Sequence, residues 1–395
     1  MGSPVRSLNT QLVCAFTAIV AASPIARAQT SRAPTVIESA TPQWTAASAW
    51  KVDPKPILTL GDADPVFSSI ASAHRYADGR IVVADEKAKE LLLFDATDAF
   101  LRKIARPGSG PGEFQALGQM FSAGGDSIAV WDRRTRRLTY FGDRGQFLRS
   151  NAAATGTPVA GGRMTVFPSP LGRFADGSLL AEQNRGTKRA ETSKMIVDST
   201  TYVLMGAATN KSIGDFFARE TWDFWHTNGD VSFGDSPFAR VGAVVVGPQS
   251  FFVSNGAQYE VTEYDKAGVP LRVMRIRRNL TLVTSAQLAQ YKRDFHETSK
   301  EHDADVVKWI TIPKTLPTFN QLVRDTDGRI WARNYNVNPS FTRYDVFDTT
   351  GRWLGSIGFP NNSTLLEAGK DWVLLRVFSA DGEPLVELHR LIRPQ

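Results

Sequence analysis

Short apolar runs, each bounded by tight polar turns, recur along most of the chain. Two stretches show the pattern most completely, residues 76–104 and residues 125–148. In each, a turn rich in Asp and Gly precedes an apolar run that ends at an Asp. Two further apolar runs follow, each after a polar turn. Gly and Asp accept the positive φ that hairpin turns require, and runs this short are typical of strands. The pattern therefore predicts a repeated antiparallel sheet.

The module returns four more times with variation. These copies begin at about Phe174, Val241, Asp327 and Leu365. The last copy lacks an outer strand, whereas the run Pro56–Gly61, ahead of the first copy, has no other partner. Pairing this run with the last sheet would leave no open edge between the first and last repeats. We therefore predict an all-β fold, a six-bladed β-propeller closed by an N-terminal strand. It spans residues 51–395, and residues 29–50 form an N-terminal linker.

Between the first two copies lies the sequence Gly-Ser-Gly-Pro-Gly-Glu-Phe, residues 108–114. With the later Ile-Ala-Val-Trp-Asp and Gly-Gln-Phe-Leu-Arg, it resembles the NHL repeat and the bacterial six-bladed propellers of largely unassigned function. The resemblance is strong over residues 65–150, clear again at 319–358, and weak in the third, fourth and sixth copies. It implies that the glycine-rich loop carries the chain from one blade to the next. A phosphate-binding role would need a helix start directly after the loop, and the pattern shows none.

Two insertions break the repeat. The first, at about residues 184–235, holds a cluster of aromatic residues that includes Trp222 and Trp225. Such a cluster could stack on a sugar or a planar ligand, or pack a long loop onto the rim. The second, residues 277–317, contains a predicted amphipathic helix that starts with a Thr284–Gln287 capping box. That helix could serve as a lid, as a platform for a partner, or as an inert decoration.

The first 28 residues have the pattern of a signal peptide. Arg6 supplies a positive charge, an apolar run follows, and Ala26-Arg27-Ala28 forms a small-x-small cleavage site. The apolar run is shorter than the roughly 20 residues that span a bilayer, so we expect no stable membrane insertion after cleavage. We expect export to the periplasm or the exterior. The single cysteine, Cys14, lies in this segment, which excludes disulfides and thiolate sites from the mature chain.

The formal net charge of +6 does not alter the prediction of an exported propeller. The arginines are scattered over predicted strands and turns instead of forming a basic patch, which favours a solvated basic surface. We therefore expect no nucleic-acid partner, and a monomer.

The candidate binding residues lie where the second strand of each blade ends, on the face that frames the central channel. The set is Asp85, Asp132, Arg133, Glu182, Gln183, Asn184, Asn255, Asn334 and Asn336, together with Trp222 and Trp225 of the first insertion. Such a ring could hold a calcium or other divalent ion through oxygen ligands, or bind a polar ligand by hydrogen bonds. Alternatively, an Asp at a strand end only caps the next turn.

Catalytic signatures are absent from the sequence. There is no Gly-x-Ser-x-Gly elbow, and His296, Glu297 and His302 do not match His-Glu-x-x-His, so we predict no catalytic or metal residues. The leading hypothesis is an exported NHL-like propeller that binds a protein or a small polar ligand, or acts as a scaffold, through its channel-mouth face. The alternative is a metal-assisted hydrolase or lyase, lactonase-like or amidating-lyase-like, with a divalent ion in the channel.

Overall fold

A computed structural model of the chain divides into residues 1–32 and Ala33–Gln395. The structure describes residues 33–152, 157–158, 165–183, 194–206, 210–225, 231–235, 237–298, 312–336, 342–359 and 363–394. All of them belong to the second unit. The predicted signal peptide lies outside the described residues.

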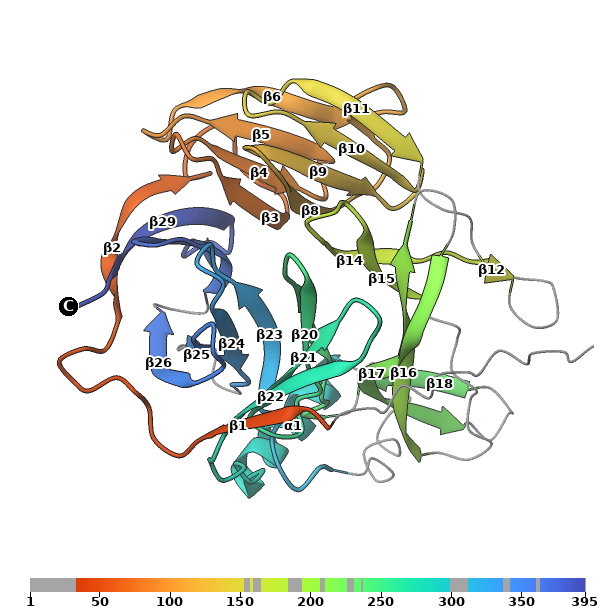
Figure 1. Cartoon of the computed structure of the whole chain (residues 1–395), viewed down its shortest axis with the longest axis vertical. Helices are drawn as coiled ribbons and strands as arrows, with labels where there is room; N and C mark the ends of the chain where they lie inside the picture. The colour runs from red at the N-terminus through yellow and green to blue at the C-terminus, as the bar shows by residue number, and fades with distance from the viewer. Residues whose placement is uncertain are drawn as a thin grey trace, which may run out of the picture. The chain divides into compact units, whose positions relative to one another are not determined.

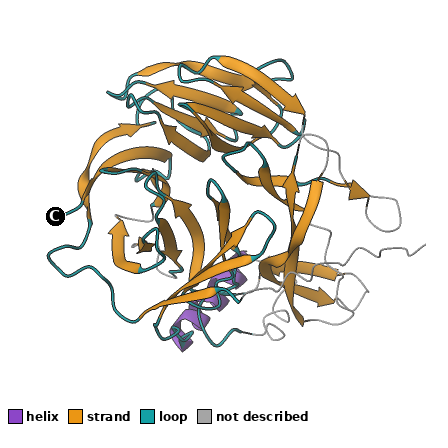
Figure 2. Ribbon diagram, in the orientation of Figure 1, coloured by secondary structure: helices purple, strands orange, loops and turns teal. Residues whose placement is uncertain are grey.

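Six sheets, here called blades 1 to 6 in chain order, make up this unit (Figures 1 and 2). Blade 1 contains β3 (Ile70–Arg75), β4 (Ile81–Asp85), β5 (Glu90–Phe94), β6 (Phe100–Pro107) and the short β7 (Glu113–Phe114). Blade 2 contains β8 (Leu117–Gly124), β9 (Ser127–Asp132), β10 (Arg137–Phe141) and β11 (Phe147–Ala152). Blade 3 contains β14 (Ser169–Arg173), β15 (Leu179–Gln183), β16 (Lys194–Met205), β17 (Asn210–Trp225) and β18 (Val231–Asp235).

The other three blades follow the same order from the inner strand outward. Blade 4 contains β19 (Ala243–Val246), β20 (Ser250–Ser254), β21 (Glu260–Asp265), β22 (Pro270–Ile276) and β1 (Thr35–Ser39). Blade 5 contains β23 (Phe319–Arg324), β24 (Ile330–Asn334), β25 (Thr342–Phe347) and β26 (Trp353–Phe359). Blade 6 contains β27 (Thr364–Ala368), β28 (Trp372–Phe378), β29 (Pro384–Ile392) and β2 (Lys51–Leu60). A small pair, β12 (Thr157–Pro158) and β13 (Thr165–Val166), lies between blades 2 and 3 in the chain.

The inner strands form a closed circle. Each contacts the inner strand of the next blade, in the order β3, β8, β14, β19, β23, β27 and back to β3. The hydrophobic core is divided in the same way, because each of its six clusters draws on two neighbouring blades. In β4, for example, Val83 packs toward blade 6 and Val82 toward blade 2. A second strand is thus buried on both faces, which explains its unbroken apolar run.

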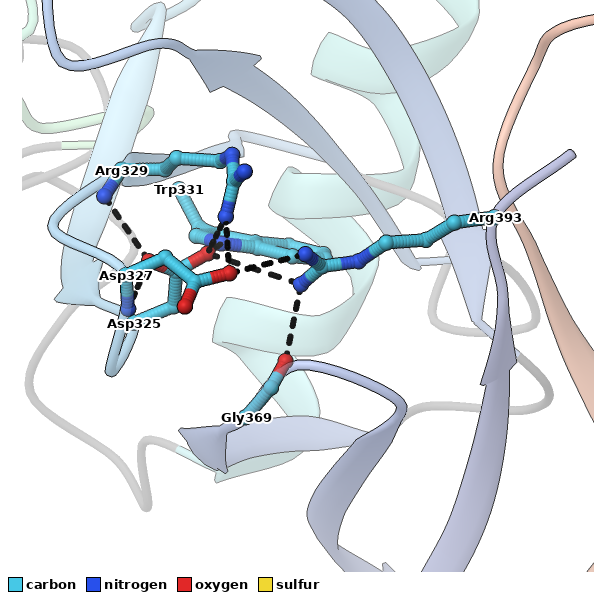
Figure 3. Close-up of polar contacts among 6 residues, drawn as sticks. All are labelled: Asp325, Asp327, Arg329, Trp331, Gly369 and Arg393. Carbon is cyan, nitrogen blue, oxygen red and sulfur yellow. Dashed lines mark hydrogen bonds and ion pairs between the residues drawn. The ribbon is translucent and has the colours of Figure 1, made fainter. Parts of the chain in front are cut away.

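The predicted closing strand is confirmed. β2 pairs antiparallel with β29, so the strand that precedes blade 1 and the last strand of the chain share blade 6. The C-terminal segment adds side-chain links to blade 5 (Figure 3). Arg393 donates to the carboxylate of Asp327 in blade 5 (2.9 Å) and also to the carbonyl of Gly369 in blade 6 (2.8 Å).

The residues ahead of the closing strand β2 make backbone contacts with two other blades. β1 adds a parallel fifth strand to blade 4 beside β22. Farther on, the backbone of Trp44 donates to the carbonyl of Leu354 in blade 5 (2.7 Å). Part of the region interpreted as a linker, residues 29–50, is therefore a strap over blades 4 and 5. The sequence analysis did not foresee it, because a lone five-residue strand has no turn of its own to mark it.

The two insertions differ in kind. The first extends blade 3 through the long antiparallel pair β16 and β17. The second contains α1 (Ser285–Thr298), and its predicted capping box is confirmed. The backbone of Thr284 donates to Gln287 Oε1 (2.9 Å), and the backbone of Gln287 donates to Thr284 Oγ1 (3.2 Å). Among the described residues, no helix has the length and apolar character needed to cross a membrane.

Candidate functional site

The channel-mouth face is the side of the ring on which each inner strand begins opposite the end of its second strand. Strand register makes one position equivalent in all six blades. These positions are Asp85, Asp132, Glu182, Ser254, Asn334 and Arg376. The side chains at these positions differ from blade to blade.

In blades 1 and 2 the aspartate at this position accepts hydrogen bonds from backbone N–H groups. Asp132 is fully buried and accepts hydrogen bonds from the backbone N–H of Gln115 (2.8 Å), Ala116 (3.3 Å), Arg134 (2.9 Å) and Thr135 (3.0 Å). Burial by itself would raise the pKa of Asp132, but the hydrogen bonds outweigh it and lower the pKa. Three of these bonds share Oδ1 and one falls on Oδ2, so both oxygens of the carboxylate are engaged by backbone.

Asp85 is bound in the same way in blade 1. It accepts from the backbone of Ser68 (2.6 Å), Ser69 (3.1 Å) and Ala88 (3.0 Å). Each of the two aspartates thus joins the loop that enters its blade to the turn that follows its second strand. This geometry is that of a turn cap, and binding of a ligand by either residue stays a prediction.

Other predicted residues on this face also have protein partners. Arg133 forms an ion pair with Glu86 of blade 1. Asn334 accepts a hydrogen bond from Arg278 (3.1 Å) and donates to the buried Asp345 (2.9 Å), which itself pairs with both terminal nitrogens of Arg278. This network attaches the chain after β22 to blade 5.

Asn336 is exposed just beyond β24, and Asn184 lies outside the described residues. Trp222 and Trp225 fall on β17, but their side chains are not among those that the structure describes. Whether these tryptophans contact a ligand therefore stays a prediction.

Blade 3 holds Glu182 and Gln183. Gln183 is buried and donates from Nε2 to the carbonyl of Val166 (3.1 Å). Burial raises the pKa of Glu182, and the positive charge of Arg219 opposes this only in part. Glu182 lies directly across the sheet from Tyr202, so both side chains are on the blade face that packs against blade 4.

Asn255, next after β20, lines a groove of about 310 Å³ between blades 3 and 4. We call it the acidic groove, because Asp215 and Glu260 line it and no Lys, Arg or His does. Asp215 accepts a hydrogen bond from Thr201 Oγ1 (2.6 Å). Glu260 forms an ion pair (2.9 Å) with Arg275. Asn255 is thus a predicted residue that the structure places in a cavity.

Aromatic rings make one wall of the acidic groove. Phe216 stacks on Tyr202 at 4.3 Å between ring centroids and meets the edge of Tyr264 at 5.2 Å. Tyr264 in turn stacks on Phe251 at 5.3 Å. Burial raises the pKa of Tyr264, so its hydroxyl stays protonated at neutral pH. The rings fix one another and give the groove a rigid apolar side.

Comparison with known proteins gives the same architecture. Residues 64–159 match the model of the DUF5128 family, described as a 6-bladed beta-propeller. This chain is a six-bladed β-propeller. None of the curated proteins matches its sequence.

Several solved structures resemble the propeller at low identity. A Bacteroides fragilis protein described as exported is 12% identical, with 91% of this chain and 99% of that chain covered and a TM-score of 0.47. A DUF4221 family member from Bacteroides vulgatus is 9% identical over 88% of this chain and 99% of that chain, with a TM-score of 0.47. The calcium-binding protein regucalcin from Agrobacterium tumefaciens is 12% identical over 91% and 97%, with a TM-score of 0.38.

Two of the six equivalent positions on this face, Ser254 and Arg376, were not among the predicted residues. Arg376 holds in blade 6 the position of Asp85 in blade 1, and it donates to the carbonyl of Ile70 (3.1 Å) and to Thr364 Oγ1 (3.3 Å). Burial, and next the nearby charge of Arg333, lower the pKa of Arg376. The available signal was the end of the second apolar run in the sixth copy, which falls at Arg376, but an arginine there did not match the acidic and amide residues expected at this position. Across the described residues, no group of three or more His, Cys, Asp or Glu is placed to hold a metal ion.

Proposed function

We propose that this chain is an exported binding propeller, and that its acidic groove takes a small solute rich in hydrogen-bond donors. The observation that carries the proposal is the groove between blades 3 and 4, which combines two carboxylates, an amide and a rigid aromatic wall. Hydroxyl or ammonium groups of a ligand would donate to the carboxylates.

The charge of the groove favours such a ligand over an anion. Asp215 is exposed, and its bond from Thr201 occupies one of the lone pairs of its carboxylate. Among the described residues it has no basic partner. A ligand that donates to a charged acceptor gains roughly twice the strength of a neutral hydrogen bond. Glu260 adds a second acceptor, although its ion pair with Arg275 offsets part of its charge.

The size and stiffness of the groove limit the ligand further. A volume of about 310 Å³ is at the lower end of the range typical of ligand pockets, about 300–1,000 Å³. This size suits one sugar ring or a short diamine better than a peptide. Because Phe216 and Tyr264 are already held by their neighbours, little side-chain entropy would be lost on binding.

Calorimetric titration of the exported protein with two panels of compounds tests the proposal. One panel contains neutral monosaccharides, and the other contains small diamines and amino alcohols. We expect at least one panel to bind, and Asp215→Asn to weaken that binding by about tenfold, since a hydrogen bond to a charged group contributes about 1.5–3 kcal/mol.

The matched control is Asp62→Asn, the same chemical change at an exposed position between β2 and β3. It should leave the affinity unchanged. Absence of binding from both panels would overturn the proposal, as would equal affinities of the Asp215→Asn protein and the unaltered one. Which panel binds tells a saccharide site from an amine site.

A further inference from the structure

A second groove, of about 440 Å³, lies between blades 2 and 3. Two arginines line it, Arg149 from β11 and Arg173 from the end of β14. We call it the basic groove. The rest of its lining is mixed, with the apolar side chains of Leu138, Leu179 and Met205 and the polar ones of Asn151, Asp176 and Ser178. None of the predicted site residues lies in this groove.

Arg173 has a structural reason to be present but an incomplete set of partners. It belongs to an Arg-x-x-Asp-Gly sequence that recurs in blades 1 and 5, where Arg75 and Arg324 hold its position. Its guanidinium lies against the turn at Gly177, where an added Cβ would be 3.2 Å from Nη2. The Nε of Arg173 is buried without a hydrogen-bond partner. The Nε of the equivalent Arg75 is buried in the same way, so this atom is out of reach of a ligand, and Arg173 contributes to the groove as a positive charge in its lining.

Arg149 departs from the behaviour of its equivalents. In blade 1 the arginine at this place in the outer strand, Arg102, donates to the carbonyl of Arg144 in blade 2. In blade 4 the equivalent Arg272 donates to the carbonyl of Thr349 in blade 5 (2.8 Å). Each of these two arginines thus joins its blade to the next one.

Arg149 makes no such bond to any residue that the structure describes. Its guanidinium lies over the ring of Tyr140, 4.3 Å from the centroid. The two residues are directly opposite in strands β10 and β11, so both face blade 3. The donors of Arg149 are therefore left available beside the basic groove.

The carboxylate in the groove wall is already occupied. Asp176 accepts from Lys266 Nζ (2.6 Å) and from Ser178 Oγ (2.6 Å). These contacts, with Lys266 first, hold the pKa of Asp176 far below its usual value. Its negative charge is thus offset by Lys266 and does not neutralise either arginine. The groove keeps an excess of positive charge.

We infer that the basic groove is a second ligand site, which takes a small organic carboxylate with an apolar body. The planar forks of Arg149 and Arg173 match a carboxylate, and the apolar walls match a hydrocarbon chain or ring. Tyr140 is restrained by the guanidinium above it, so the floor of the site is formed before a ligand arrives.

The test compares benzoate with benzamide, a neutral compound of the same shape, by calorimetric titration of the exported protein. We expect benzoate to bind at least about tenfold more tightly, because only the carboxylate pairs with the two guanidinium groups. Acetate and inorganic phosphate complete the series. Acetate lacks the apolar body and should bind more weakly than benzoate.

Three variants locate the site. Arg149→Gln and Arg173→Gln should each weaken benzoate binding by about tenfold, since each removes one charged hydrogen-bonding group. Arg102→Gln, the same change at the equivalent position of blade 1, is the control and should bind as the unaltered protein does. If Arg173→Gln fails to fold, the exposed Arg149 still decides the question.

Equal binding of benzoate and benzamide would overturn the inference, as would an Arg149→Gln protein with unchanged affinity. Phosphate or acetate binding as tightly as benzoate would overturn the assignment of an apolar carboxylate. Asp215→Asn, in the acidic groove, should not alter benzoate binding, so failure of one site is distinguishable from failure of the other.

Discussion

The acidic groove and the basic groove both border blade 3, and their side chains carry opposite charge. Asp215 and Glu260 line the groove toward blade 4, whereas Arg149 and Arg173 line the groove toward blade 2. Both are gaps between two successive blades of one repeated module. The difference shows that the repeat provides the gap, and that the side chains lining each gap give it its chemistry.

The channel-mouth positions of blades 1 and 2 behave differently from both grooves. Asp85 and Asp132 keep the repeated pattern, and their carboxylates accept hydrogen bonds from backbone amides. Arg149 departs from the pattern of Arg102 and Arg272, because it makes no such bond to a described residue and its guanidinium lies over Tyr140. Arg173, in the same groove, keeps the repeated pattern, so a candidate site combines residues that follow the repeat with residues that depart from it.

The largest expected effect separates these two kinds of residue. Asp132→Ala should lower the free energy of unfolding by about 3 kcal/mol or more, because buried amides lose their acceptor. Asp215→Ala, in the acidic groove, should change it by less than about 1 kcal/mol, as an exposed substitution does. Guanidinium denaturation of the two variants and the unaltered protein measures both. Similar losses for the two variants would contradict the contrast.

A smaller effect is expected in the pH dependence of stability. The pKa of Asp132 is lower in the folded protein than its usual value. The charged form therefore stabilises the fold above about pH 4, and this stabilisation is lost as the pH falls through the folded pKa. Asp132→Asn should therefore be less stable than the unaltered protein at pH 7, and the gap should narrow below about pH 4. Unfolding curves at a series of pH values measure the gap, with exposed Asp62→Asn as the control. A gap that stays constant from pH 7 to pH 3 would count against this.

The smallest expected effect is on the salt dependence of binding. Benzoate in the basic groove should lose affinity by about two- to threefold between 20 and 200 mM salt, because mobile ions screen partly exposed charges. A neutral sugar in the acidic groove should show almost no change, whereas a diamine should weaken as benzoate does. Titrations at the two salt concentrations compare the grooves directly. Salt-independent binding of benzoate would contradict a charge-paired site.

Much of the fold was predictable from local pattern. The runs that became β4 and β9, the turns at Gly79 and Gly145, and the capping box at Thr284 are encoded within a few residues of themselves. The number of blades follows from counting such modules. The closing strand β2 was found because the last copy lacked an outer strand, which is a deduction from the repeat as a whole.

The candidate sites were predictable only in small part. Asn255 was named on the basis of its strand end, and the structure places it in a cavity. Asp215, Glu260, Arg149 and Arg173 were missed, because nothing near them in the sequence distinguishes them from other strand residues. Each groove joins segments from two blades, and residue spacing within one blade does not reveal what the next blade presents.

The sequence by itself determined the strands, their turns, the six-fold count and the closure, because alternation and turn chemistry act over short distances. Tertiary structure decided where β1 pairs and which polar groups find partners. Arg102 and Arg149 occupy equivalent places in their strands, but Arg102 meets a carbonyl of the next blade, whereas Arg149 lies on Tyr140 of its own blade. A hydrogen bond needs an acceptor within about 3 Å, and here that acceptor comes from a different blade.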